Sequence, residues 1–98
     1  MKSFSIPVFG CRIYFTRESD KAETWLEKRG FADSLYGVDG LCTALTGEIL
    51  VYVAKDEDGL LAHECYHAAC RVLEAVGAEH DEETAAHLLQ YIVDQCSN

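Results

Sequence analysis

Residues 41–54 read Leu-Cys-Thr-Ala-Leu-Thr-Gly-Glu-Ile-Leu-Val-Tyr-Val-Ala. Two apolar runs, 41–45 and 49–54, flank the short stretch 46–48, and this arrangement is typical of a β-hairpin. The second run is apolar without a break, as expected for a strand that is covered on both faces. The segment therefore predicts a strand pair whose second member is interior; an edge strand that pairs with an extended substrate is the alternative.

The residues before this hairpin predict two further strands and a helix. Apolar positions alternate over residues 4–16 around Gly10, which favours two short strands that meet near this glycine. Residues 21–29 follow Asp20 and end before Gly30, so they are expected to form a helix. Residues 30–40 contain three glycines and are expected to be a loop.

Two helices are expected after the hairpin. A helical pattern covers residues 59–76, with Asp58 as its N-cap and Gly77 as its end. A last helix, capped by Asp81, runs to about Gln95. Strands, a helix, a hairpin and two helices in this order predict an α+β fold with a short mixed or antiparallel sheet. A chain of 98 residues is expected to form a single domain, residues 1–98.

Charge and hydropathy narrow the possible partners. The chain has 8 Lys and Arg against 17 Asp and Glu, which gives a formal net charge of −9. Such a balance argues against binding to nucleic acid or to an anionic membrane, because both depend on basic residues. No apolar run approaches the ~20 residues of a membrane helix, and no secretory signal pattern is found. We therefore expect an acidic, cytoplasmic protein of undetermined oligomeric state.

The cysteines are expected to be reduced. Their number is odd and no two of them form a C-x-x-C pair, so neither a disulfide framework nor a cysteine-rich zinc site is predicted. Most of them are expected to be small buried residues. They are Cys11, Cys42, Cys65, Cys70 and Cys96.

The most informative stretch is His63-Glu64-Cys65-Tyr66-His67, an H-E-x-x-H pattern in the first of the two C-terminal helices. Histidines four residues apart lie one turn apart on the same face, so both imidazoles can reach one cation. Zn²⁺ accepts imidazole nitrogen readily. Glu64 would stand beside the metal, where a carboxylate can take a proton from a zinc-activated water.

A third ligand is expected from the last helix. Glu83 belongs to a polar stripe on this helix, and it is the ligand if that stripe faces the histidines across a shallow cleft. The alternatives are Glu82, His87 or no carboxylate ligand at all. The chain between the end of the first C-terminal helix and His80 is too short for His80 to reach the metal. His87, one turn beyond Glu83, would then contact the ligands or the substrate. The stripe consists of Glu83, His87, Gln90 and Asp94.

Residues 61–93 resemble the carboxy-terminal half of small phage-encoded zincin-like proteins, in which a HECxHA helix precedes an acidic E-x-x-A-aromatic-L helix. Their organisation is similar to that of minimal gluzincin metallopeptidases. The resemblance implies a Zn²⁺ ion between the two helices, with His63, His67 and Glu83 as ligands and Glu64 as general base. His87 stands where the family has an aromatic residue, so it would add an electrophile or compete for the metal.

Two functions follow from these observations. The first is a zinc-dependent metallopeptidase with Glu64 and His87 as catalytic residues and a peptide or protein as substrate, located in the host cytoplasm if the chain is phage-encoded. His80, Tyr66 and Tyr91 are further candidates for oxyanion support. The second is a non-catalytic, zinc-stabilised acidic module that binds a host or virion protein. Glu64 favours the first function, because a purely structural zinc site has no need of a carboxylate there.

Overall fold

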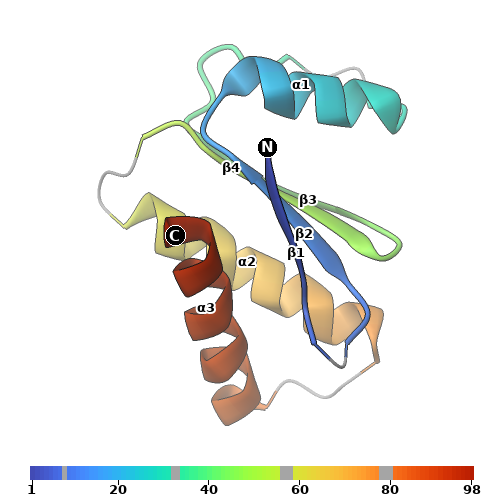
Figure 1. Ribbon diagram of the computed structural model, residues 1–98, viewed down its shortest axis with the longest axis vertical. Helices are drawn as coiled ribbons and strands as arrows, with labels where there is room; N and C mark the ends of the chain where they lie inside the picture. The colour runs from blue at the N-terminus through green and yellow to red at the C-terminus, as the bar shows by residue number, and fades with distance from the viewer. Residues whose placement is uncertain (8, 32–33, 56–58, 78–80) are drawn as a thin grey trace.

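Four strands form one mixed sheet in the computed structural model, which describes residues 1–7, 9–31, 34–55, 59–77 and 81–98 (Figure 1). The spatial order of the strands is β1-β2-β4-β3, with β1 paired antiparallel to β2, β2 parallel to β4, and β4 antiparallel to β3. The predicted hairpin is confirmed, and its second strand lies inside the sheet rather than at an edge. The strands are β1 (Lys2–Ser5), β2 (Arg12–Thr16), β3 (Gly40–Leu45) and β4 (Glu48–Val53).

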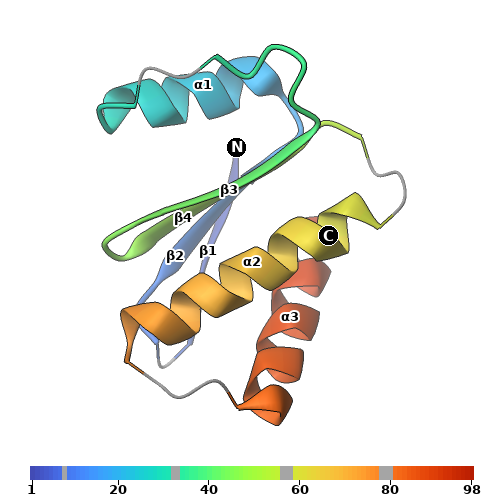
Figure 2. The same cartoon turned by 180° about the vertical axis from the view of Figure 1, so that it is seen from behind.

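Three helices cover the two faces of this sheet. Helix α1 lies on one face, and α2 and α3 lie together on the other face (Figures 1 and 2). The helices are α1 (Ser19–Lys28), α2 (Leu60–Ala75) and α3 (Glu82–Ser97). The predicted α+β fold class is therefore confirmed, with one helix after β2 and two helices that pack against each other at the C-terminal end.

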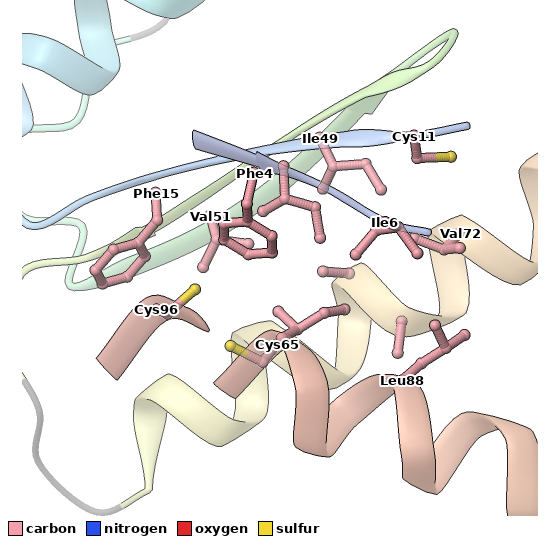
Figure 3. Close-up of a cluster of buried hydrophobic side chains, with 14 of the residues drawn as sticks. Phe4, Ile6, Cys11, Phe15, Ile49, Val51, Cys65, Val72, Leu88 and Cys96 are labelled. Carbon is pink, nitrogen blue, oxygen red and sulfur yellow. The ribbon is translucent and has the colours of Figure 1, made fainter. Parts of the chain in front are cut away.

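Strand β4 has buried side chains on both faces of the sheet, so both faces are covered by helices. Side chains alternate between the faces of a strand, so an unbroken apolar strand contributes to two cores. Residues 49, 51 and 53 of β4 belong to the larger core, which lies between the sheet and helices α2 and α3 (Figure 3). Leu50 and Tyr52 point to the other face, where they pack with Trp25 of α1. Burial of each such side chain stabilises the fold by about 1.5–3 kcal/mol.

Helices α2 and α3 divide the lower face of the sheet between them. Helix α2 packs along β3 and β4, as Figure 2 shows. Helix α3 reaches β1: the rings of Phe4 and Tyr91 meet edge to face at 6.2 Å, and Lys2 Nζ donates a hydrogen bond to the Gln95 carbonyl at 2.9 Å. This arrangement leaves the half of α2 that carries the histidines next to the β3 edge of the sheet.

The ends of the two C-terminal helices agree in part with the sequence prediction. The Asp81 side chain accepts a hydrogen bond from the Thr84 backbone N–H at 3.0 Å, so the predicted cap of α3 is confirmed. Gly59 occupies the N-cap position of α2 with φ +73°, and the predicted cap Asp58 lies outside the described residues. Among the described helices, none is long and apolar enough to cross a bilayer.

Candidate metal centre

His63 and His67 stand one turn apart on α2, as the sequence predicts, and the edge of one ring points toward the other ring. The two Nε2 atoms are 3.2 Å apart, the ring centroids are 4.7 Å apart, and the ring planes are inclined by 81°. These are positions 4 and 8 of a sixteen-residue helix, where the backbone is held on both sides by regular turns. The pair is therefore a preformed imidazole site at the surface of the helix.

The separation of the two nitrogens fits a tetrahedral metal site. With Zn–N bonds of about 2.0–2.1 Å and a tetrahedral angle, two ligand nitrogens lie roughly 3.3 Å apart. The observed separation of 3.2 Å is close to this distance. An N–H···N hydrogen bond between two neutral imidazoles has a similar length. The two nitrogens can therefore either bind one metal ion or, without a metal, form a hydrogen bond with each other.

Glu64 completes the cluster from the buried side of the helix. Ligand atoms of His63, Glu64 and His67 all lie within 4.8 Å of one another. The histidine rings reach solvent, whereas the Glu64 side chain is only 7% exposed. A carboxylate this close to the imidazoles can accept a proton from a water held between them.

Gly40, the first residue of β3, determines where the Glu64 carboxylate lies. A Cβ atom at this position would come within 2.8 Å of Glu64 Oε2 and within 3.1–3.2 Å of the Leu60 methyl groups. A side chain at this position would therefore require the ends of the Glu64 and Leu60 side chains to shift. Gly40, expected to belong to the loop 30–40, is instead the first residue of β3. Its position next to the apolar run 41–45 was the available signal for this contact.

Cys42 lies two residues further along β3, near Glu64. Burial, and to a lesser extent the negative charge of Glu64, raise the pKa of the Cys42 thiol to about 12. The thiol therefore stays protonated at neutral pH, and the thiolate is the form that binds metal.

Glu83 and His87 lie elsewhere on the surface. His87 Nε2 is 3.3 Å from a carboxylate oxygen of Glu83, and the two side chains are 72% and 81% exposed, respectively. The buried face of α3 consists of Ala85, Leu88, Ile92 and Cys96. Because this face packs against the rest of the protein, the predicted polar stripe points into solvent at Glu83 and His87.

The packing of the two C-terminal helices explains this separation. Cys65 of α2 and Cys96 of α3 belong to the same buried cluster (Figure 3), so the first half of α2 meets the last turn of α3. Glu83 precedes Cys96 by thirteen residues, which is about 20 Å along the helix at ~1.5 Å per residue. Within the described residues, the structure brings His63, His67 and Glu64 together and leaves Glu83 outside this group.

The aromatic candidates differ in their distance from the cluster. The Tyr66 ring is 6.5 Å from the His67 ring, and a hydrogen bond with Cys70 raises the pKa of Tyr66. Tyr91 faces β1, where its hydroxyl lies 3.5 Å from the Ser5 carbonyl oxygen. His80 lies outside the described residues. Tyr66 is therefore the described aromatic candidate that neighbours the histidines.

No protein family, curated protein or solved structure matches this chain. The site is therefore defined by its own residues: His63, Glu64 and His67 on α2 form a group that could hold a metal ion.

Proposed function

We propose that the protein is a zinc-dependent hydrolase of peptide bonds, with the metal held by His63 and His67 and with Glu64 as general base. The observation that carries the proposal is the 3.2 Å separation of the two Nε2 atoms, with a carboxylate within 4.8 Å of both. Zinc bound here would lower the pKa of a water and polarise a carbonyl group.

The protein groups would divide the chemistry as follows. Glu64 accepts a proton from the attacking water and returns it to the amine nitrogen that leaves. Its carboxylate is buried against Gly40 of β3, which limits the space in which it can move before a substrate arrives. The histidine side of the cluster is open to solvent, which gives an extended peptide access to the site. Tyr66, on the same helix surface, is a candidate donor to the carbonyl oxygen.

The third protein ligand is part of the proposal. Glu83 is the residue that the sequence favours, and its carboxylate is exposed and lies 3.3 Å from His87 Nε2. Closure of the site by Glu83 would require the first turn of α3 to approach α2. A site with two histidines and solvent in the remaining positions is the arrangement that the present geometry supports without movement.

A non-catalytic, zinc-stabilised module that binds a host or virion protein is the second candidate. It is favoured by the formal net charge of −9, which suits contact with a basic partner surface. Such a module would keep the metal and use the acidic surface to meet a basic partner.

A Glu64→Gln variant separates the two functions. Loaded with zinc, it should retain the metal and lose hydrolysis of an unfolded-protein panel by a factor of about 10²–10⁴, because the amide cannot accept the proton. Glu74→Gln is the matched control: it makes the same chemical change on the same helix, at an exposed residue paired with Arg71. If wild-type protein and Glu64→Gln cleave the panel equally, the hydrolase proposal is wrong, whereas zinc binding without hydrolysis in either supports the second candidate.

A further inference from the structure

Helix α1 does not cover the whole of its face of the sheet. It packs mainly on β4 and β2, and the start of β1 lies beneath it in both views (Figures 1 and 2). Ser3 of β1 is paired with Tyr14 of β2, so their side chains lie on the same face, and the small serine leaves space beside the tyrosine ring. A hollow of about 490 Å³ lies here, lined by residues of β1, β2 and α1. Small-molecule sites typically have volumes of about 300–1,000 Å³.

Two aromatic residues form one wall of this hollow. The rings of Tyr14 and Trp25 are 5.7 Å apart and inclined by 56°. Tyr14 is half-buried, and the Arg29 guanidinium lies over the Trp25 ring at 3.9 Å from its centroid. The indole N–H of Trp25 is buried and has no hydrogen-bond partner in the part of the chain that the structure describes. The wall therefore offers apolar ring surface and contains a donor without an acceptor.

The lining is also basic, although the chain as a whole is acidic. Lys21, Lys28 and Arg29 line the hollow, together with Asp20. Residues 1–30 contain six of the eight Lys and Arg against four Asp and Glu, whereas residues 31–98 contain two Lys and Arg against thirteen Asp and Glu. A small anion is therefore attracted to the part of the protein around this hollow and repelled from the rest of the chain.

Lys28 is the cation in this lining that is left for a ligand. Arg29 donates two hydrogen bonds to Glu48. Lys21 forms an ion pair with Glu18 at 2.8 Å. Among the described residues, no ion pair involves Lys28, which is exposed in the last turn of α1. One unpaired ammonium group matches a singly charged carboxylate better than a doubly charged phosphate.

We propose that this hollow binds a small aromatic carboxylate, with its ring against Tyr14 and its carboxylate beside Lys28. Ser3 Oγ accepts a hydrogen bond from Arg12 at 2.9 Å, so its own hydrogen is left to donate to a carboxylate oxygen. A ligand oxygen that reaches the Trp25 indole N–H would also give this donor the acceptor that it lacks. The site is independent of the proposed hydrolase, since the metal cluster lies on α2, on the other face of the sheet.

Titration of the isotope-labelled full-length protein with naphthoate, followed by nitrogen–proton correlation NMR, tests this proposal. Trp25 is the one tryptophan of the chain, so its indole N–H gives a single resonance that reports on the hollow. We expect this resonance to shift with a dissociation constant of about 0.1–1 mM. The neutral analogue naphthylmethanol should bind more weakly, because it lacks the charge that Lys28 attracts.

Three results of this titration would overturn the proposal. The first is an indole resonance that does not shift at about 10 mM naphthoate. The second is binding of naphthylmethanol as tight as that of naphthoate, which would exclude the carboxylate contact. The third is tighter binding of inorganic phosphate, which would make the hollow a phosphate site.

Lysine variants locate the carboxylate. Lys28→Gln should weaken naphthoate binding about two- to fivefold, as expected for an exposed ion pair. Lys55→Gln is the matched control, since Lys55 is also exposed but does not line the hollow, and it should leave binding unchanged. Equal binding by Lys28→Gln and Lys55→Gln would refute Lys28 as the partner of the carboxylate. Glu64→Gln should bind naphthoate like the wild type, whether or not the protein is a hydrolase.

Discussion

Replacement of Gly40 by alanine tests the contact that positions Glu64. The added methyl group would meet Glu64 Oε2 at 2.8 Å, whereas ordinary contacts begin near 3.4 Å, so the carboxylate must move by about 0.6 Å. The same methyl group would lie 3.1–3.2 Å from the Leu60 methyl groups, so the Leu60 side chain would also have to shift by a few tenths of an ångström. The substitution therefore displaces the proposed base while leaving both histidines untouched.

The expected magnitudes follow from this displacement. A misplacement of about 1 Å at a catalytic group can cost around 10²-fold in rate, so a shift of about 0.6 Å should lower hydrolysis by roughly tenfold or more. Overpacking costs about 1–3 kcal/mol, and removal of a glycine from a strand returns about 0.5–1 kcal/mol. The net loss of stability is about 0–2.5 kcal/mol, and zinc affinity should stay within about twofold.

The assay compares Gly40→Ala with Thr43→Ala for zinc affinity, thermal stability and hydrolysis of the same protein panel. Thr43 belongs to the same strand but, by the alternation of side chains, to the face opposite that of Gly40. The Thr43→Ala substitution should therefore leave hydrolysis unchanged. If Gly40→Ala retains both the melting temperature and the hydrolysis of the wild type, then β3 does not hold the Glu64 carboxylate and the positioning argument is wrong.

Two further predictions concern charges outside the cluster. Glu83→Ala should weaken zinc retention by roughly tenfold or more in a chelator competition if Glu83 is a ligand, whereas Glu82→Ala should not; the reverse result would assign the ligand to Glu82. Arg29 donates two hydrogen bonds to Glu48, at 2.8 and 3.1 Å, and lowers the pKa of that carboxyl group below its ordinary value of 4.5. The stabilisation from this pair is present above the ordinary pKa and is lost as the pH falls through the lower, folded value. Glu48→Gln should therefore melt below the wild type at pH 6, and this difference should shrink at pH 3. Fluorescence of Trp25, which lies 3.9 Å beneath Arg29, follows the melting; a difference that persists at pH 3 would contradict the assignment.

The elements of the fold were predictable because their signals are local. The hairpin, the helix after β2 and both C-terminal helices follow from periodicity and from glycines at element ends. The strand order was not predictable, since the parallel pairing of β2 with β4 depends on how α1 crosses the sheet. An apolar β4 indicated an interior strand without identifying its second neighbour.

The site was predictable only where one helix contains it. The spacing of His63 and His67 places their rings together through helix geometry alone. The placement of Glu83 depended on which way a second helix turns, and the apolar positions Ala85 and Leu88 decide this by packing inward. A polar stripe predicts which face of a helix lies outside the core, but it does not predict whether another helix or strand lies opposite that face. The Gly40 contact was hidden for the same reason, because it joins β3 to α2.

A competitive-chelator zinc titration of the wild-type protein, His63→Ala and His67→Ala tests the central claim most directly, with His87→Ala as the exposed-histidine control. We predict one zinc ion per chain in the wild type and in His87→Ala, and loss of that ion in each of the other two variants. Zinc binding that is absent from the wild type, or that is unchanged in both His63→Ala and His67→Ala, would contradict the account.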